Sequence, residues 1–405
     1  MTIDTKNTPA QAGSNSVRLL AVLAALGTLS TNIILPSFPS ISADLNVTSV
    51  RLGLTLSCFF LVFAVGQLIV GPLSDRVGRL RPVVIGMVIF IAGCFICAFA
   101  TDFNMLLAGR VVQAAGVCAA SVLSRAIARD LFEGMTLMKA MSFMMVASAA
   151  APGFSPLAGA LLENSFGWQS TFWFTAIIAV LATLWYVLAV GETHAPASSS
   201  DKTNPVQSYI QVSSKIEFMA PALATAFIIG GLFGFFSAAP SILQVQMGLS
   251  NIAVGWFFAS TVFVVFAAGA VASNLVKQSS PAFVSVMGLF VAVMGGLGLV
   301  ISGTFDAGNI ITFSVSTVIF LFGMGLALPL CTGQALTPFA HLAGAASSLL
   351  GFLQMMGAAV GTGIIATLTI SPAVSLGLVQ AVGCSIGMLG LFLSMNKQQS
   401  KLQSQ

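Results

Sequence analysis

A short charged segment between two long apolar stretches carries the most specific pattern in the sequence. It reads GPLSDRVGRLR over residues 71–81. Gly71 and Gly78 permit close approach and unusual backbone angles. Asp75 can face a helix N-terminus, and Arg76 and Arg79 can pair with carboxylates or with helix C-termini. A loop that only carried positive charge would need scattered basic residues, so the ordered pattern predicts ion pairing between helix ends.

Arg110 is the only charged residue well inside an apolar stretch. We expect it to lie roughly 9 Å below one membrane surface, at 1.5 Å of helix rise per residue. Asn32 has a similar depth in the first apolar stretch, so the two side chains are predicted to meet. Asn32 and Gln113 can accept hydrogen bonds from the guanidinium group but cannot neutralise it. Two hypotheses stay open: a positive binding site that favours neutral or anionic ligands, and an arginine that bonds carbonyl groups and water and only holds its helix in place.

The elements that position these residues are membrane-spanning helices. Hydrophobic residues make up 57% of the 405-residue chain and charged residues only 6%, far below the roughly 25% of soluble domains. Apolar runs of about 20 residues must form helices in lipid, because the backbone has to bond internally there. We predict twelve spans, at residues 18–38, 50–72, 82–101, 104–127, 137–162, 169–190, 219–242, 252–275, 283–303, 309–330, 342–368 and 372–394.

The distribution of basic residues predicts the orientation. With both termini in the cytoplasm, nearly all of the 15 basic residues lie on the cytoplasmic side, as the positive-inside rule requires. Arg51 is the outside exception. The polar stretch 191–218 follows the sixth span and reads as a flexible linker. The predicted order is a tail over 1–17, a six-helix bundle over 18–190, the linker, a second six-helix bundle over 219–394 and a tail over 395–405.

No predicted span interior contains a carboxylate or a histidine. The eleven acidic residues fall in loops, tails or span ends. A proton carrier at mid-membrane needs a group that titrates near working pH, and the sequence offers none there. If protons do move, Asp130 and Glu133 are the first candidates to reach the pathway.

The motifs resemble those of the major facilitator superfamily, whose loop between spans two and three has the G-x-L-x-D-R-x-G-R-x-R pattern of residues 71–81. Arg110 and Gln113 resemble its R-x-x-Q motif in span four. Residues 151–160, APGFSPLAGA, resemble the antiporter motif of span five, with Pro152, Pro156 and Gly159 as its helix-shaping residues. Ala151, Ser155 and Ala160 replace the usual glycines, although small residues with proline still allow a bendable, closely packed helix.

Finer features resemble one branch, the Bcr/CflA-like drug-resistance transporters. They include Leu35-Pro36 and Pro39, Arg125 with Arg129-Asp130-Leu131, Gly167-Trp168, and Ser237 with Pro240. The resemblance implies an all-α fold of two six-helix bundles around a central cavity, and export of small molecules from a bacterial inner membrane in exchange for protons, as a monomer. It also implies that Asp75, Arg79 and Arg125 form an inner gate by ion pairing. Membrane anchoring by these three residues is the alternative.

The chain departs from this branch in span one. Members usually carry an aspartate in a D-x-x-L-P pattern, where this chain has Asn32. The change removes a charge and keeps the size, so a carrier for one metabolite with weak or unusual proton coupling stays open. Residues expected to touch substrate are Asn32, Arg110, Gln113, Phe236, Ser237 and Gln354, because polar groups in lipid are expensive to leave unpaired.

Other functional classes lack their residues in this sequence. We find no Ser/His/Asp arrangement, no metal-ligand cluster and no phosphate-binding loop, and the chain contains only two histidines. The sequence therefore predicts neither an enzyme nor an ATP-driven pump, and no cofactor or nucleic-acid partner. The predicted partners are a small-molecule substrate, protons and the lipid bilayer.

Overall fold

The computed structural model describes residues 13–194, 205–305 and 309–403. Within these ranges it contains twelve helical segments long and apolar enough to cross a membrane, as predicted. The first tail and the middle of the predicted linker lie largely outside the described residues. The helices are α1 (Ser14–Asn32), η2 (Leu35–Ser37), α2 (Phe38–Asp44), α3 (Ser49–Val77), α4 (Leu80–Ala98), α5 (Phe103–Leu131), α6 (Gly134–Phe166), α7 (Gln169–Ala189), α8 (Pro205–Ser213), α9 (Ile216–Pro240), η3 (Ser241–Gln246), α10 (Asn251–Leu275), α11 (Pro281–Phe305), α12 (Ile310–Leu336), η4 (Thr337–Leu342), α13 (Ala343–Thr367) and α14 (Pro372–Gln403).

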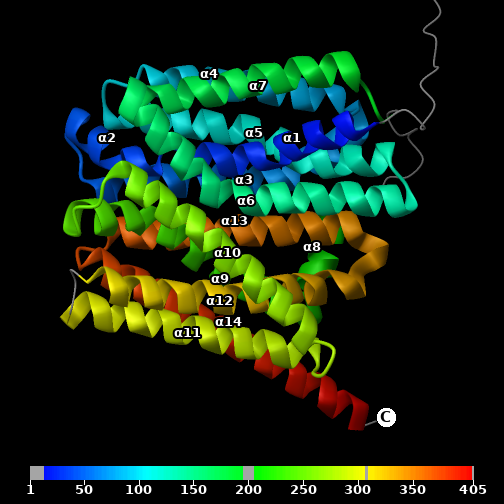
Figure 1. The fold of residues 1–405 in the computed structure, drawn as a ribbon. Coiled ribbons are helices and arrows are strands. Elements are labelled where there is room, and N and C mark those ends of the chain that lie inside the picture. Colours follow the sequence, from blue (N-terminus) through cyan, green and yellow to red (C-terminus); the bar gives the residue numbers. More distant parts are fainter. Residues whose placement is uncertain (1–12, 195–204, 306–308, 404–405) are drawn as a thin grey trace, which may run out of the picture.

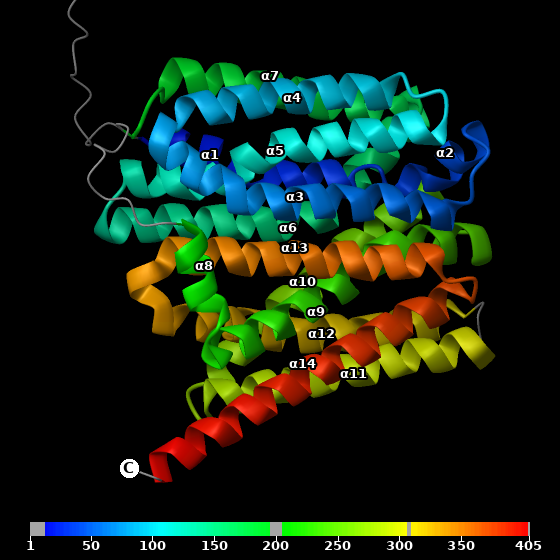
Figure 2. The same ribbon diagram turned by 180° about the vertical axis from the view of Figure 1, so that it is seen from behind.

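The helices form two groups that lie against each other. Figures 1 and 2 show α1 to α7 on one side of the molecule and α9 to α14 on the other. Helix α3 packs along α13 and α6 packs along α10, so these two pairs form most of the boundary between the groups. Helix α1 begins and α14 ends at the same face, which we call the terminal face; the opposite face, with α2, is the distal face.

The first and seventh spans are both interrupted near the distal face. Helix α1 ends at Asn32, and the 3₁₀ turn η2, which contains Pro36, leads into α2. Helix α9 ends at Pro240 and continues as the π-helix η3. Proline lacks an N–H group and disturbs the preceding turn. The two interruptions occupy corresponding positions in the two halves, as in transporters built from repeats.

The distal ends of the two halves are in contact. The Gln244 amide of η3 donates a hydrogen bond to the Pro36 carbonyl of η2, at 2.9 Å. Near mid-membrane, the rings of Phe60 and Phe233 lie 4.3 Å apart across the boundary. The structure is therefore closed between the halves at the distal face.

Glycines let the interrupted and proline-containing helices approach closely. A Cβ atom on Gly159 of α6 would lie 1.8 Å from the Ile33 carbonyl oxygen, and one on Gly153 would lie 1.9 Å from a Val262 methyl group of α10. Helix α6 thus packs backbone to backbone against α1 and also against the other half. Small residues at such contacts drive helix association in lipid, where no hydrophobic force acts between spans.

Helix α8 lies within the stretch predicted to be a flexible linker. Its Tyr209 hydroxyl donates a hydrogen bond to the Leu68 carbonyl of α3 at 3.1 Å, and its Val212 is buried in a cluster with Phe218 of α9 and Leu349 of α13. The flexibility expected over 191–218 therefore does not extend to these residues. The polar composition of the whole stretch obscured the short helix that its last part forms, Pro205–Ser213.

Replacing Gly159 with alanine tests the contact between α1 and α6. The added methyl group meets backbone that cannot rotate away, so we expect Gly159→Ala to lower the stability by about 1–3 kcal/mol, the usual range for overpacking. The measurement is the thermal unfolding midpoint in detergent. Gly269→Ala on α10 is the matched control, because a Cβ atom there meets nothing within 4 Å. Equal midpoints for the two variants would contradict the close approach.

Candidate functional site

Arg110 lies at the centre of a buried polar cluster inside the first half. The side chain is 0% exposed on α5. Its Nη1 atom donates to the Ser30 carbonyl oxygen at 3.0 Å and to Gln113 Oε1 at 2.8 Å, and the guanidinium carbon lies 4.6 Å from the Phe59 ring centroid. Its Nε and Nη2 atoms have no hydrogen bond among the described residues. Arg110 thus reaches α1 as predicted, but through a backbone carbonyl group.

Asn32 does not meet Arg110 in this conformation. Its Nδ2 atom donates to the Thr28 carbonyl at 2.7 Å and to Thr31 Oγ1 at 3.1 Å, so the amide bonds within its own helix at the point where α1 ends. No hydrogen bond joins the two side chains in the described part of the chain. The two side chains, which could have met by their expected depth, are therefore not bonded in this state. Position along a helix does not determine which side of that helix faces its neighbour.

Gln113 connects the arginine to the cysteines of α4. Its Nε2 atom lies 3.0 Å from Cys94 Sγ, and its Oε1 atom accepts from Arg110. A Cβ atom on Gly93 would lie 2.5 Å from the Gln113 backbone nitrogen, so α4 and α5 are in close contact here. The arrangement fixes the orientation of the guanidinium group from the α5 side.

The other predicted binding residues lie in the second half and at its boundary. Phe236 packs against Phe233 and Phe258, with ring centroids 5.9 and 5.3 Å apart. Ser237 is buried against the first half, because a Cβ atom on Gly53 of α3 would lie 2.5 Å from its Oγ atom. Gln354 of α13 is half-buried. The structure brings Arg110 and Gln113 together, whereas Phe236, Ser237 and Gln354 occupy separate positions along the boundary.

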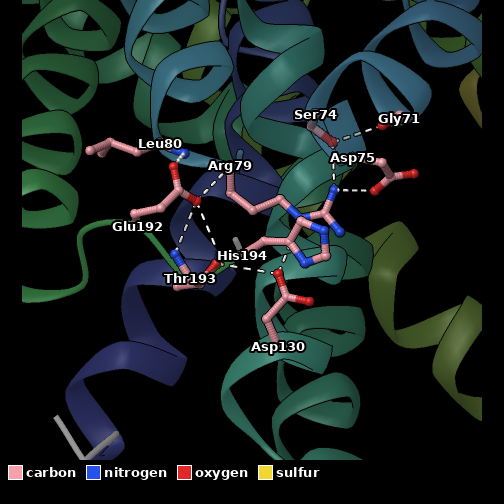
Figure 3. Close-up of polar contacts among 9 residues, drawn as sticks. All are labelled: Gly71, Ser74, Asp75, Arg79, Leu80, Asp130, Glu192, Thr193 and His194. Atoms are coloured by element: carbon pink, nitrogen blue, oxygen red, sulfur yellow. Dashed lines mark hydrogen bonds and ion pairs between the residues drawn. The ribbon is translucent and has the colours of Figure 1, made fainter. Parts of the chain in front are cut away.

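The charged loop between α3 and α4 forms an ion-pair cluster at the terminal face (Figure 3). Arg79 Nη1 lies 2.5 Å from Asp75 Oδ1, and Arg79 Nε lies 3.1 Å from Asp130 Oδ2 at the end of α5. Nη1 also donates to Ser74 Oγ at 2.6 Å. Burial alone would lower the pKa of Arg79, but the two carboxylates raise it above its ordinary value. The cluster joins the terminal ends of three helices of the same half.

Glu192 completes this cluster and was not singled out by the sequence reasoning. Its two carboxylate oxygens accept hydrogen bonds from the backbone N–H groups of Arg79, at 2.7 Å, and Leu80, at 3.1 Å. These are free donors at the start of α4, where a negative charge is favourable. Burial alone would raise the pKa of Glu192, but backbone hydrogen bonds from Arg79, Leu80, Thr193 and His194 hold it below its ordinary value.

Gly78 is required at its position for two reasons. Its φ is +90°, a value that residues with a side chain rarely adopt, and a Cβ atom there would lie 2.4 Å from Glu192 Oε2. The second glycine of the loop pattern thus makes room for the carboxylate that caps α4. The sequence marks Glu192 only as an acidic residue directly after the sixth span, and the backbone that it caps lies 113 residues earlier in the chain.

Of the remaining predicted gating residues, Gly71 joins the cluster through its carbonyl oxygen, which accepts a hydrogen bond from Ser74 Oγ at 2.8 Å (Figure 3), and Arg76 and Arg125 take no part. The side chains of Arg76 and Arg125 are exposed, and neither forms an ion pair among the described residues. Gly71 of α3 lies close to α13, since a Cβ atom there would be 3.7 Å from Ser348 Oγ. The ion pairing expected of Asp75 and Arg79 is present in this state, and that expected of Arg125 is not.

The proline-containing helix α6 packs against α1 of its own half through Gly159 and against α10 of the other half through Gly153. It runs without interruption past Pro152 and Pro156. Near its distal end lies Glu163, which is only 8% exposed. The predicted span ended at residue 162, so this carboxylate was placed at the end of the span, outside its interior. Helix α6 continues to Phe166 and the side chain is buried.

Comparison with known proteins identifies the family. Residues 20–362 match the family model described as Major Facilitator Superfamily. The chain belongs to the major facilitator superfamily. The loop cluster and the twelve spans are therefore those of a superfamily transporter and not of an enzyme.

Several superfamily transporters are similar over most of their length. An uncharacterised transporter, YdgK of Bacillus subtilis, is 30% identical over 92% of this chain and 94% of its own. Multidrug resistance protein D of Escherichia coli is 28% identical over 89% of both chains. Multidrug resistance protein MdtL of Citrobacter koseri is 28% identical over 80% of this chain and 81% of its own.

A solved structure supports the superfamily fold. A bacterial homologue of the human lysosomal transporter Spinster, in an inward-facing and occupied conformation, superposes with a TM-score of 0.74 over 96% of this chain and 98% of its own, at 17% identity. At that identity the likeness concerns the fold alone.

Glu192 provides a pH test of the loop cluster. Because the folded state lowers its pKa, its stabilising effect is complete above the unfolded value, about 4.3, and is lost as the pH falls through the folded value. We expect Glu192→Ala to lower stability at neutral pH by about 0.5–2 kcal/mol, as for loss of a helix cap. The difference from the native protein should shrink in acid. Unfolding midpoints at pH 7 and pH 4 measure this, with the exposed Glu133→Ala as control; an equal loss at both pH values would contradict the capping role.

Proposed function

We propose that this transporter exports small molecules, including drugs or toxic metabolites, by alternating access in exchange for protons. The observation that carries the proposal is the 28% identity to multidrug resistance protein D over 89% of both chains. The similarity to MdtL points the same way. The proposed location is the bacterial inner membrane, where the protein acts as a monomer.

The proposed orientation places the terminal face in the cytoplasm. The α3–α4 and α5–α6 connections lie at this face. With the adjoining helix ends they contain Arg76, Arg79, Arg81, Arg129 and Lys139, and an excess of basic residues is typical of cytoplasmic loops. The distal face, at which the halves are in contact, is then the outer face. The conformation described above is in this view closed at the outer face.

The proposed substrate region lies between the halves, beside the polar and aromatic residues named above. Arg110 supplies a positive charge that no carboxylate balances among the described residues. A positive charge in a site of low dielectric raises the affinity for anions and lowers it for cations, so anionic and neutral ligands are both favoured over cations. The proposed preference is therefore for neutral and anionic compounds. The carbonyl contact to Ser30 also fits the alternative, in which Arg110 holds α5 against α1.

A second candidate function is a carrier for one metabolite with weak or unusual coupling. The observation that favours it is Asn32, an amide where drug-exporting relatives carry an aspartate by the resemblance described above. In such a carrier, substrate moves down its own gradient and no carboxylate is needed in span one. The two candidates differ in whether substrate movement drives proton movement.

A panel of charged and neutral compounds tests the proposed selectivity. Counterflow in proteoliposomes would compare chloramphenicol, fluorescein and ethidium for the native protein, Arg110→Gln and the charge-preserving Arg110→Lys. We expect Arg110→Gln to lower the ratio of anionic to cationic transport by about tenfold, equivalent to about 1.4 kcal/mol. Arg110→Lys should keep the native ratio. If the native protein prefers ethidium, the electrostatic part of the proposal is wrong. If both variants lose all transport alike, Arg110 holds the helix.

Proton movement tests the coupling. A pH-sensitive dye inside proteoliposomes should report proton movement when substrate is added to the native protein. Asn32→Asp restores a carboxylate at the interruption of span one, so we expect more protons to move per substrate. Substrate transport by the native protein without proton movement would refute antiport and favour the metabolite carrier. An unchanged ratio in the variant would show that position 32 does not reach the proton pathway.

A further inference from the structure

Glu163 lies where three elements from both halves meet at the distal face. Its Oε1 atom accepts a hydrogen bond from Ser40 Oγ of α2. The Ser37 hydroxyl of η2 and the Asn251 side chain at the start of α10 approach the same carboxyl group. Helix α6 and η2 belong to the first half and α10 to the second. The carboxyl group therefore sits on the boundary that must open for the distal face to become accessible.

Polar contacts continue from Glu163 across this boundary. Asn251 Oδ1 accepts a hydrogen bond from Gln244 Nε2 at 3.0 Å, and the same Gln244 nitrogen donates to the Pro36 carbonyl at 2.9 Å. We call Glu163, Ser37, Ser40, Gln244 and Asn251 the distal latch. Its contacts link the interruption of span one to that of span seven and to the start of span eight.

The latch contains buried polar atoms without partners. Glu163 Oε2, Ser37 Oγ and Gln244 Oε1 are buried, and none has a hydrogen bond of regular geometry among the described residues. An unpaired polar atom of this kind costs roughly 1–3 kcal/mol, and more if it is charged. When the carboxyl group is ionised, Glu163 Oε2 and Gln244 Oε1 can accept hydrogen bonds but cannot donate them. The Ser37 hydroxyl can donate to one of these two oxygens, and a protonated Glu163 supplies the second donor that the set needs.

The surroundings of Glu163 hold no compensating positive charge. The elements packed against it are α1 with η2 and α2, α10, α5 and α7, with η3 beyond. Near the distal face these carry Asp44, whose carboxylate accepts from Trp168 Nε1 at 2.7 Å, and Asp102, which caps α5. Arg110 is held by Ser30 and Gln113. Among the described residues no cation pairs with Glu163, and a buried unpaired carboxylate is costly in a membrane protein.

We propose that Glu163 is a proton-binding site: it takes up a proton from the distal solution as the two halves close there, and releases it when they part. When the halves part, Asn251 leaves with α10, water reaches the carboxyl group, and the ionised form is solvated. A hollow of about 400 Å³ on the same face, lined by Pro39, Ser241 and Val245 among others, brings solvent beside the latch. The inference rests on the alternating access of the proposed function and goes beyond it by naming the group.

Linkage gives the direction of the effect. Because closure of the distal face binds a proton, a lower pH favours the closed state. One linked proton changes the ratio of closed to open molecules by at most about tenfold per pH unit. The effect needs no substrate, so its measurement is independent of whether the substrate and antiport proposals hold.

The test follows the distance between the halves at the distal face as the pH changes. Spin labels at Thr101→Cys and Gln246→Cys, both exposed positions, in the full chain with its native cysteines replaced, would be measured in nanodiscs between pH 5 and pH 8. We expect the short-distance population of the native sequence to grow as the pH falls. Glu163→Gln keeps the size and the hydrogen bonding but cannot ionise, so it should stay closed at every pH. Asp102→Asn, which retains the cap of α5, should keep the native response.

Two further outcomes bear on the proposal. Asn251→Ala removes the contact that α10 of the second half makes to Glu163 in the closed state, so it should reduce the closed population at a given pH while keeping the pH response. If Glu163→Gln keeps the native pH response, or if the native sequence shows none, the proposal is wrong. If Glu163→Gln does not fold, the comparison of Asn251→Ala with the native sequence decides: a closed population that is unchanged at every pH then refutes the latch. Loss of drug transport with an intact titration would instead refute only the proposed substrate.

Discussion

Backbone hydrogen bonding without water is the constraint on which this structure depends. Inside lipid every N–H and carbonyl group has to find its partner within the protein, and the interruptions at Pro36 and Pro240 break that rule locally. The freed groups attract side chains: Arg110 reaches the Ser30 carbonyl just before the first interruption, and Gln244 reaches the Pro36 carbonyl. Two of the polar contacts of this apolar protein therefore lie where its helices are broken. One belongs to the Arg110 cluster and the other to the distal latch.

The sequence alone was sufficient to predict the number of spans and their approximate positions, because each apolar run is long and each separating segment is polar or contains glycine. The charged loop was also predictable, since its residue order is specific and its pairs are local: Asp75 and Arg79 are four residues apart. Contacts between distant segments were not predictable. The helical repeat gives the depth of Asn32 and Arg110, but the rotation of each helix is set by packing, and so Arg110 bonds Ser30 and not Asn32.

The burial of Glu163 is a second feature that could not be predicted from the sequence. Hydropathy places the end of a span where charge appears, and therefore puts a carboxylate near a helix end outside the span interior. Whether its side chain is exposed to solvent depends on the segments packed against it. Here those segments come from spans one and eight, far away in the chain. Glu192 presents the same limit at the other face. Its capping of α4 is visible only once the ends of α7 and α4 are seen to lie together.

The position of Glu192 in the chain has a consequence for biosynthesis. It lies 113 residues after Arg79, whose backbone it caps. While the ribosome makes spans three to six, Glu192 is not yet present to cap the start of span three. The ion pair between Arg79 and Asp130 also forms only after span four is complete. Proteins generally fold domain by domain during synthesis. The last residues of this half to leave the ribosome thus bond to one of the first loops to be inserted. The packing of the first half can therefore be completed only after the sixth span has emerged.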